Sequence, residues 1–595
     1  MAIDSVPARF FAQATQRTDQ PAYYVRQNGA WQPTTWKTYV DEVRSAARAL
    51  IALGFEPHDR VAILGFNAPS WVIADVAAMA AGGVPAGIYT TCSPEEVQYI
   101  TDHCEAKLIF LEDEGQWEKV AAQRENLPKL QHAVMFRGAP AVDDPLVLSW
   151  EAFLARGEQT PASAVDERIA ALEQDAAATL IYTSGTTGPP KAVTLTHRNL
   201  AWTSGQALTF VHAAETDSSL SYLPLSHIAE QMFTVHVPAT AGSRIYFAED
   251  FTKVADNLRE TQPTIVFGVP RVWEKFHAAV TAKLAQETGL KARLLRWAQD
   301  VGRRANDELN QGRAPGGLLG LKYRLADRLI YSKIKPALGL GKLRFAASGA
   351  APIAKEILDF FAGLDIVIRE VYGQSEDTGP TTFNALGHTR FGTVGPAFPG
   401  VEVKIADDGE ILVKGPNVFA GYLKDPAATV DTLIDGWLYS GDLGAFDQDG
   451  YLTITGRKKE IIITAGGKNI APKNIEAALK NLELVSQAVV IGDRRKYLSA
   501  LLTLDPDAVG RFAEEYGIDP SAAPAHPKVL DALQKGVDEV NKLFARVENI
   551  RKFRVLPEDF SVDGGELTPT MKVKRRVIND KYGDVIESMY GEDGD

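Results

Sequence analysis

The sequence has few cysteines, no long uninterrupted apolar run and no surplus of positive charge, and each shortage excludes a class of protein. Cys92 and Cys104 are the only cysteines, which are too few for a disulfide scaffold or a cysteine zinc cluster. The most apolar stretch, residues 71–89, is broken by Asp75, Gly82, Gly83 and Pro85, so no membrane-spanning helix is expected there. No basic segment followed by an apolar one opens the chain, and we expect no signal peptide.

Positive charge is outweighed, because 63 lysines and arginines stand against 76 aspartates and glutamates, for a net charge of -13. This argues against general nucleic-acid binding, since neutralising phosphates needs a surplus of lysine and arginine. Any site for a polyanion must therefore be local. With 45% hydrophobic and 23% charged residues among 595, the chain has the composition of a globular protein with more than one folding unit. Its few cysteines fit a reducing cytosol.

Helical and strand-like patterns alternate through the first part of the chain. Apolar residues recur with helical spacing over 35–53, and the segment ends at Gly54. A further helix is predicted over about 70–81, and buried strands are predicted at 61–65, 107–111 and 133–136. Such alternation is typical of α/β proteins with parallel strands, so we predict an α/β fold.

A stretch rich in glycine and hydroxyl side chains follows the apolar run at 176–181. Residues 182–191 read Tyr-Thr-Ser-Gly-Thr-Thr-Gly-Pro-Pro-Lys. Closely spaced N–H groups, hydroxyls and one lysine suit a polyphosphate. The Walker A motif is excluded, because two prolines separate the second glycine from the lysine. A flexible turn between core elements is the alternative for such a short run.

Two later segments carry the other parts of a nucleotide site, each after a predicted strand. Residues 344–352 end in small side chains, which let a flat ligand approach the backbone closely. Residues 367–376 end in Tyr-Gly-Gln-Ser-Glu, which offers an aromatic face and a hard oxygen ligand for Mg²⁺. His227 lies in the apolar segment 222–230 and is either a packed core residue or part of this pocket.

One helical region is basic although the whole chain is acidic. Residues 283–342 contain thirteen lysines and arginines and five acidic residues, and leucines are mixed among the cations. Basic amphipathic helices of this kind suit the surface of an anionic membrane. The alternative is a solvated helical face whose apolar side packs on its own domain.

Five segments follow one another in a set order, at 182–191, 348–352, 372–376, 439–443 and 456–460. Together they resemble the core motifs of the acyl-adenylate-forming superfamily, which includes acyl-CoA synthetases, luciferase and nonribosomal adenylation domains. Segments 87–96, 224–230 and 567–572 resemble the bacterial long-chain fatty acyl-CoA synthetases within it. The resemblance implies a large N-terminal domain of αβ-layered subdomains with a small β-barrel-like part, and a small mobile α+β C-terminal domain.

The resemblance also implies residue roles in a site for ATP. The loop that would hold the β- and γ-phosphates comprises Thr183, Ser184, Gly185, Thr186, Thr187, Gly188 and Lys191. Residues implied to frame adenine are Gly349, Ala350, Ala351 and Tyr372, and the same nucleotide site would include Gly373, Gln374, Ser375 and Arg457. Asp442 would accept hydrogen bonds from both ribose hydroxyls. Mg²⁺ would be bound by Thr183 and Glu376.

A domain boundary follows from the same resemblance. It implies an AMP-binding and fatty-acid-binding domain at 1–456 and a C-terminal domain at 457–595, with Lys459 at the pivot between them. Lys572 would reach the reacting carboxylate. The implied catalytic residues are Lys572, Glu376, Thr186 and Lys459. Because further lysine and arginine residues follow at 574–576, a merely basic strand is the alternative at Lys572.

The implied activity is the ligation of a long-chain fatty acid to coenzyme A with ATP. The carboxylate attacks the α-phosphorus, pyrophosphate leaves, and the coenzyme A thiol then displaces AMP from the acyl-adenylate; Mg²⁺ and Lys572 would neutralise charge in the first step. A fatty acyl-AMP ligase that loads a carrier protein is one alternative. A noncatalytic fatty-acid or nucleotide binding protein at the membrane surface is another. The expected location is cytoplasmic, with peripheral contact at the inner membrane face through 283–342.

Two features depart from the superfamily pattern. Residues 505–552 add a helical stretch to which the sequence assigns no function. Met571 stands immediately before Lys572, where many members have a glycine.

Overall fold

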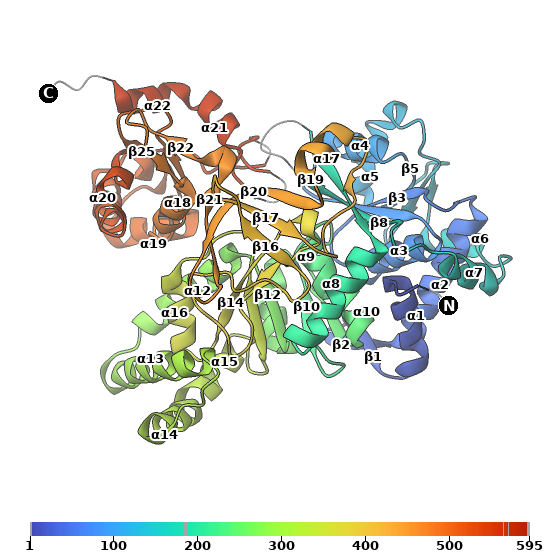
Figure 1. Ribbon diagram of the computed structural model, residues 1–595, viewed down its shortest axis with the longest axis horizontal. Coiled ribbons are helices and arrows are strands. Elements are labelled where there is room, and N and C mark those ends of the chain that lie inside the picture. Colours follow the sequence, from blue (N-terminus) through green and yellow to red (C-terminus); the bar gives the residue numbers. More distant parts are fainter. Residues whose placement is uncertain (1–2, 184–188, 563, 569–570, 592–595) are drawn as a thin grey trace.

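The computed structural model of the chain describes residues 3–183, 189–562, 564–568 and 571–591. A large α/β body is formed by the N-terminal part of the chain, and a smaller C-terminal domain, drawn in orange and red, sits at one end of it (Figure 1). The predicted α/β class is confirmed. Within the described residues, no helix is both long enough and apolar enough to cross a membrane.

The largest sheet carries the predicted parallel strands and also the glycine-rich loop. Its strand order is β18-β9-β8-β4-β3-β5-β6-β7, with bounds Gly421–Tyr422, Lys191–Thr196, Ala177–Thr183, Val84–Ile88, Arg60–Leu64, Ala106–Leu111, His132–Met135 and Val147–Leu148. Strands from β8 to β7 run parallel, whereas β9 and β18 are antiparallel to their neighbours. The loop therefore connects two adjacent antiparallel strands at one side of the sheet.

The apolar stretch at 71–89 is buried inside this body. It forms most of α3 (Pro69–Ala80) and all of β4. Helix α2 (Trp36–Ala52) packs against α3 through residues that recur with helical spacing, among them Val43, Ala47 and Leu50. The apolar run is therefore explained by burial on all sides within the domain core.

Two smaller sheets complete the α/β body. One has the order β10-β11-β1-β2, with bounds Ser218–Ser221, Arg244–Phe247, Pro21–Gln27 and Ala30–Thr35. The other has the order β12-β13-β14-β15, with bounds Ile265–Gly268, Phe345–Ser348, Ile368–Tyr372 and Thr382–Phe383. Strands β12, β13 and β14 are parallel, so their carboxyl ends lie along one edge, where β13 and β14 lead into the nucleotide motifs.

The expected β-barrel-like part is an open sheet. Its order is β16-β17-β20-β19, with β21 also paired to β20, and the bounds are Glu402–Ile405, Glu410–Lys414, Trp437–Phe446, Leu433–Ile434 and Leu452–Arg457. In the part of the chain that the structure describes, β16 pairs with β17 alone. Because no further pairing joins the edges, the sheet does not close.

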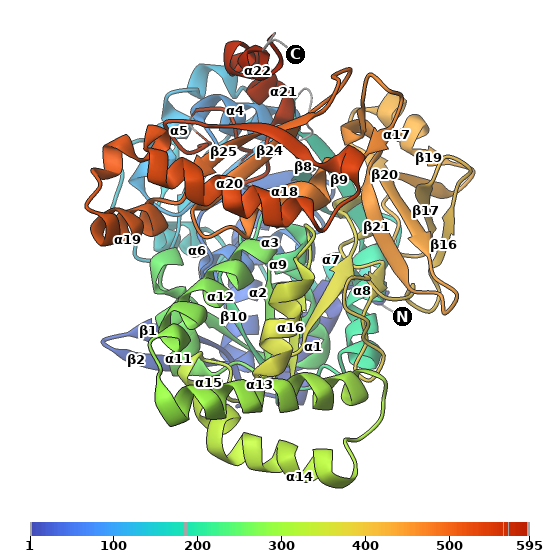
Figure 2. The same ribbon diagram turned by 90° about the vertical axis from the view of Figure 1, so that its left-hand side faces the viewer.

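A helical hairpin projects from the body beside α12 (Pro270–Ala285) and α16 (Lys355–Gly363). It consists of α13 (Gly289–Asn310), α14 (Gly317–Ala326), a π-helical turn at Asp327–Tyr331 and α15 (Ser332–Ala337). This is the basic region of the sequence. Figures 1 and 2 both show α14 at the end of the molecule opposite the C-terminal domain.

The C-terminal domain is an α+β unit with its own core. Its main sheet has the order β24-β25-β26, with bounds Val485–Ile491, Leu498–Leu504 and Ile550–Val555, and a small β-ladder joins β22 (Ile462–Ile463) to β23 (Asn469–Ile470). The helices are α18 (Pro472–Lys480), α19 (Pro506–Tyr516), α20 (Pro527–Asn541), α21 (Arg575–Lys581) and α22 (Gly583–Tyr590). The added stretch at 505–552 thus contains α19, α20, two short 3-10 segments and the start of β26. Helix α20 packs into this core through Leu533 and Val537.

Candidate nucleotide and adenylation site

Asp442 is the centre of a buried hydrogen-bonded cluster at the edge of the open sheet. Its Oδ2 accepts a hydrogen bond from the Tyr372 hydroxyl at 2.9 Å and another from the Gln374 amide. Its Oδ1 accepts from Arg457 Nε at 2.8 Å. Gln374 also donates to the Ser440 carbonyl at 2.8 Å. Three donors therefore hold this carboxylate in one orientation.

The charges in this cluster are coupled. Burial alone would lower the pKa of Arg457, but the adjacent Asp442 carboxylate raises it above the ordinary value. Burial, followed by the charge of Asp442, raises the pKa of the Tyr372 hydroxyl well above its usual range. Tyr372 therefore remains a neutral hydrogen-bond donor and aromatic surface at any physiological pH.

Close packing around Tyr372 leaves no room for a side chain at two of the predicted glycines. A Cβ on Gly373 would lie 1.5 Å from the carbonyl oxygen of Gly379, and a Cβ on Gly349 would lie 2.7 Å from a methyl group of Val371. Gly349 follows β13 and Tyr372 ends the neighbouring strand β14. The two motifs meet because these strands are paired, with Ala350 and Ala351 exposed beyond β13 and Ser375 buried.

The predicted phosphate loop is seen only at its two ends. Ser184, Gly185, Thr186, Thr187 and Gly188 lie outside the described residues. Thr183 ends β8 and pairs with Lys191, which begins β9, and the Thr183 hydroxyl donates to the Lys191 carbonyl at 3.4 Å. The Lys191 ammonium lies 4.9 Å from the ring centre of Tyr422 and 3.9 Å from a carboxylate oxygen of Asp425.

Glu376 is linked to this strand pair through Tyr422. The Tyr422 hydroxyl donates to Glu376 Oε1 at 2.9 Å, and β18, which contains Tyr422, pairs with β9. Tyr422 was not among the predicted site residues. It follows Gly421 in a two-residue strand that carries no recognisable motif. Only the pairing of β18 with β9 brings it to Glu376.

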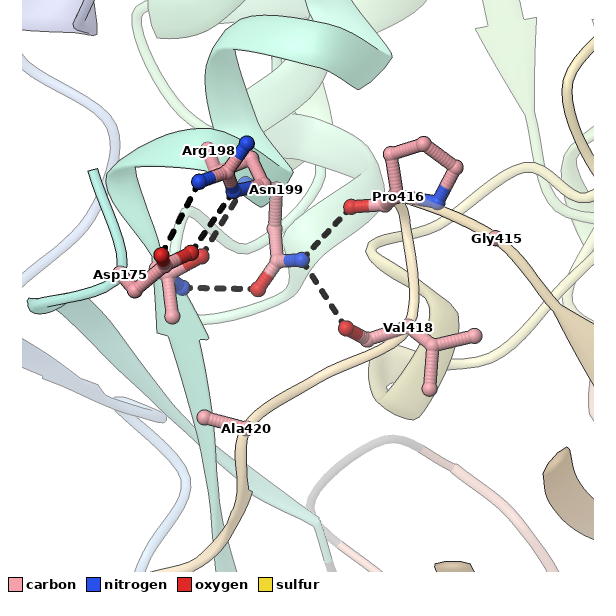
Figure 3. Close-up of a pocket in the computed structure, with 8 residues that line it drawn as sticks. Asp175, Arg198, Asn199, Gly415, Pro416, Val418 and Ala420 are labelled. Carbon is pink, nitrogen blue, oxygen red and sulfur yellow. Dashed lines mark hydrogen bonds and ion pairs between the residues drawn. The ribbon is translucent and has the colours of Figure 1, made fainter. Parts of the chain in front are cut away.

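Asn199 fixes the segment that leads into β18, as Figure 3 shows. Its side-chain amide donates to the carbonyl groups of Pro416 at 2.7 Å and Val418 at 2.9 Å, while its Oδ1 accepts from the Thr196 amide. The next residue, Phe419, donates its backbone N–H to the Glu376 carbonyl at 2.8 Å. Asn199 thus supports the Glu376 backbone from a distance, and its spacing from Thr196 is a capping pattern that could have indicated it.

Lys572 extends from the C-terminal domain toward the Asp442 cluster. The loop that carries it is pinned at its base, since the Lys572 amide donates to the Thr568 hydroxyl at 3.0 Å and Leu567 bridges to Val573. The side chain is exposed to solvent, but protein atoms crowd it and the charges of Arg457, Asp442 and Glu376 act on it; we call the space between these groups the cleft. This crowding, followed by repulsion from Arg457 and Lys473, lowers the pKa of Lys572 to about 8 in spite of the opposing charges of Asp442 and Glu376.

The other cations near Lys572 have different surroundings. Arg575 donates to the Val490 carbonyl and pairs with Glu476, both in its own domain, and Arg576 lies 3.9 Å from Asp580 on the same helix. The neighbouring cations therefore have partners within their own domain, and Lys572 does not share their surroundings. Met571 has a φ of 60° and is exposed, so the position before Lys572 uses a left-handed backbone that favours glycine.

His227 lies at the cleft as the N-cap of α9 (Ile228–Gln231). Burial, followed by the charge of Lys572, lowers the pKa of its imidazole to about 4. Its Nδ1 accepts from the Ala229 amide at 3.2 Å, which leaves the proton on Nε2. Of the two interpretations left open by the sequence, the pocket is favoured, with His227 as a neutral donor.

The predicted junction between the domains lies directly after the Asp442 cluster. Arg457 is the last residue of β21 and is paired with Asp442 across the sheet. Lys458 forms ion pairs with Asp408 at 2.6 Å and Glu410 at 2.8 Å, whereas Lys459 is exposed. Lys459 is therefore outside the Asp442 cluster, which contains the predicted site residues Tyr372, Gln374 and Arg457.

The donor set can be tested for its fit to Mg²⁺. Among the described residues, no group of three or more histidine, cysteine, aspartate or glutamate side chains is placed to enclose a metal ion. Glu376 and Thr183 offer a carboxylate and a hydroxyl, which fits an ion that takes its remaining ligands from phosphates and water. The site therefore suits Mg²⁺ that arrives with a nucleotide.

Family profiles match both domains of the chain. The profile described as AMP-binding enzyme matches residues 10–423, and that described as AMP-binding enzyme C-terminal domain matches residues 459–594.

Named relatives extend over almost the whole chain. It is 39% identical to the long-chain-fatty-acid–CoA ligase ACSBG2 of Xenopus laevis, with 97% of this chain and 82% of the relative covered. It is 38% identical to the long-chain-fatty-acid–CoA ligase FadD15 of Mycobacterium bovis, with 99% of this chain and 98% of the relative covered.

Solved structures of lower identity share the fold. The A-PCP didomain of carboxylic acid reductase from Segniliparus rugosus, in complex with AMP, aligns with a TM-score of 0.76 at 19% identity, over 99% of this chain and 82% of that one. ATP-bound MatB from Rhodopseudomonas palustris aligns with a TM-score of 0.70 at 23% identity, over 98% and 100%. Taken with the matched profiles and relatives, these findings establish that the chain belongs to the AMP-binding enzyme family.

Proposed function

We propose that this protein is an ATP-dependent, AMP-forming ligase that joins long-chain fatty acids to coenzyme A. The observation that carries the proposal is the position of Lys572, which comes from the C-terminal domain yet lies close enough to Asp442 and Glu376 for their charges to act on it. Both named relatives are long-chain-fatty-acid–CoA ligases, which supports the acyl substrate.

The first step joins two anions, and the described residues have the charges to allow it. Asp442 and Tyr372 would orient the ribose and adenine of ATP, with Gly349, Ala350, Ala351, Gly373, Gln374 and Ser375 forming the rest of the nucleotide surface. Lys191 and the loop 183–188 would hold the β- and γ-phosphates. The Lys572 ammonium would meet the fatty carboxylate and the α-phosphate, where its charge stabilises the transition state.

Mg²⁺ bound by Glu376 and Thr183 would supply neutralisation of phosphate charge. The Tyr422 hydroxyl already donates to Glu376, so it keeps this carboxylate oriented toward the strand that bears Lys191. In the same cleft, the Nε2 proton of His227 is available to an acceptor on the substrate. The products of this step are an acyl-adenylate and pyrophosphate.

The second step requires the coenzyme A thiol to reach the acyl-adenylate carbonyl. We propose that the domains 1–456 and 457–595 rotate relative to each other about Lys459, which withdraws Lys572 and admits the thiol. The exposure of Lys459 directly after the anchored pair Arg457 and Lys458 supports this pivot, because hinge residues need free torsions at the end of a fixed element.

Incubation with palmitate, ATP, Mg²⁺ and coenzyme A tests the function. We expect stoichiometric AMP, pyrophosphate and palmitoyl-CoA. Accumulation of palmitoyl-AMP with transfer only to an added carrier protein would instead favour a fatty acyl-AMP ligase. Binding of fatty acid or ATP without any pyrophosphate release would favour a noncatalytic binding protein.

The proposed location is the cytoplasm, which fits two buried free cysteines. Contact with the inner membrane face through the basic helices is part of the proposal, because a long-chain fatty acid partitions into lipid.

A further inference from the structure

Helix α14 exposes a row of leucines that its own domain does not cover. Leu318, Leu321, Leu325 and Leu329 recur three or four residues apart, and their exposed fractions are 68%, 63%, 49% and 37%. Such spacing places them on one face of the helix and the π-helical turn that continues it. A surface helix of a globular protein would ordinarily have polar side chains at these positions.

The opposite face of the same helix is firmly attached. Ala326 and Tyr331 are buried against Ala298 and Val301 of α13. The Tyr331 hydroxyl donates to the Ala298 carbonyl at 2.5 Å, and the Tyr323 hydroxyl donates to Asp365 at 2.6 Å. The exposed leucines are therefore not an alternative packing face of a loose helix, because the orientation of α14 is set by its other side.

Unpaired cations border the leucine row. At 100° per residue, Lys322 lies on one side of the row, and Arg324 and Arg328 lie on the other. In the part of the chain that the structure describes, no acidic side chain lies within ion-pair distance of these three cations. Many other cations of the chain are paired, as Arg26, Arg344 and Arg390 are. The combination of a leucine row with free flanking cations is complementary to a surface that has an anionic outer layer over an apolar interior.

The position of α14 in the molecule agrees with such a contact. It lies at the end opposite the C-terminal domain in both views (Figures 1 and 2). A flat surface that touches α14 therefore leaves the C-terminal domain free to move.

We propose that the leucine row of α14, with Lys322, Arg324 and Arg328, docks the enzyme on an anionic lipid bilayer. This rests on the proposed function in one respect, since a bilayer is where a long-chain fatty acid substrate is concentrated. The leucines enter the interface and the three cations contact lipid phosphates. The hairpin thereby acts as the docking element, and the net charge of -13 of the whole chain keeps the rest of the surface off the membrane.

Flotation of the full-length protein with vesicles tests the docking. One set of vesicles is phosphatidylcholine alone, and the other contains added phosphatidylglycerol. We expect binding to the anionic set only, and weaker binding as salt increases. A Leu321→Glu/Leu325→Glu variant is expected to bind at least about tenfold less, and removal of the cations by Lys322→Ala, Arg324→Ala and Arg328→Ala about fivefold less for each.

Matched substitutions at other exposed positions serve as controls. Leu543→Glu changes a leucine that is similarly exposed on the C-terminal domain, and Arg494→Ala removes an exposed cation there. Neither is expected to change flotation. Turnover of palmitate delivered on serum albumin, without vesicles, is expected to be equal in all variants, since none of the substituted residues belongs to the proposed nucleotide site.

Each result decides a separate point. Equal binding of the wild type and the leucine variant would overturn the docking surface, as would failure of the wild type to bind anionic vesicles. If the wild type is a dimer without lipid and the leucine variant is a monomer, the row would instead form a contact with a second copy of the chain. That result would also overturn the docking surface. If the wild type binds anionic vesicles but does not turn over palmitate, the ligase function would be refuted while the docking surface would be retained.

Discussion

The two walls of the cleft differ in how firmly their polar groups are held. On the N-terminal wall, Asp442 accepts three hydrogen bonds and Tyr372 is buried beside it. On the C-terminal wall, Lys572 is attached through local backbone contacts, and its side chain is reached by solvent. The polar groups of the N-terminal wall are therefore preorganised, whereas the position of Lys572 depends on the position of the C-terminal domain.

This difference matches the proposed chemistry. Nucleotide binding is needed throughout the reaction, and a rigid cluster provides it without reorganisation. Charge neutralisation at the carboxylate is needed in the first step only, so the lysine that provides it can belong to a part that moves. The comparison predicts that substitutions on the C-terminal wall and at the hinge separate the two half-reactions.

Lys572→Ala gives the largest expected separation. We expect it to slow acyl-adenylate formation at least about 10²-fold, or about 3 kcal/mol, because the charge at the reacting carboxylate is lost. Thioester formation from presynthesised acyl-adenylate should be spared. Pyrophosphate exchange and coenzyme A acylation measure the two steps, and Lys574→Ala is the matched control. Equal losses in both steps would contradict a role in one step only.

Lys459→Pro tests the hinge. Proline locks one backbone torsion, so we expect thioester formation to fall at least about tenfold while pyrophosphate exchange changes less. Lys459→Ala removes the charge but leaves the torsions free, and it should resemble the wild type. Unchanged overall turnover in the proline variant would move the pivot elsewhere.

The pH profile of adenylation reports on Lys572 itself. Its pKa of about 8 means that the ammonium is charged below pH 8 and loses its proton as the pH rises through that value. Because kcat/KM reports the protonation state of the free enzyme, kcat/KM for ATP should fall about tenfold between pH 7 and pH 9. Lys572→Arg stays charged in this range, and its lower activity should be flat with pH. A falling profile in the arginine variant would assign the titration to another group.

A contact between α12 and α19 gives the smallest expected effect. Arg271 lies 3.4 Å from Asp505 and 3.7 Å from Glu274, so the added helical stretch touches the N-terminal domain while Lys572 is in the cleft. Partly exposed pairs of this kind contribute about 0.2–1 kcal/mol. We expect Asp505→Asn to lower pyrophosphate exchange by about two- to fivefold relative to thioester formation.

Two further variants sharpen this test. Asp507→Asn changes a neighbouring acid in the same helical turn and should leave the ratio of the two rates unchanged. Exchanging the charges in Arg271→Asp/Asp505→Arg should restore part of the loss. A ratio that does not respond to any of these substitutions would show that the pair does not hold the domains together.

Local patterns predicted much of this architecture. The helix over 35–53 and the strands near 61, 107 and 133 appear as α2, β3, β5 and β6, because apolar spacing and chain breakers act over short distances. The strand before the glycine-rich loop was predicted for the same reason. The barrel-like part was predicted only by resemblance and is an open sheet, since the pairing of strand edges depends on residues far apart in the chain.

The candidate site divides in the same way. Its motif residues could be named from the sequence, because each lies in a short segment with distinctive residue types. Tyr422 could not, since its partner Glu376 is reached only through strand pairing. Asn199 is marked locally by its capping spacing from Thr196, but its contact with Pro416 depends on loop packing.

Residue types and spacing were enough to name the parts: a hydroxyl-rich loop between strands, an acid and a tyrosine for a nucleotide, a basic C-terminal segment and a basic helical region. Which of these parts meet depends on the folded chain. The fold directs Arg575 to its own domain and Lys572 into the cleft, and it turns the leucines of α14 to solvent. The physical reason is that residue type and spacing set local conformation, whereas burial, charge pairing and exposure depend on contacts between distant segments.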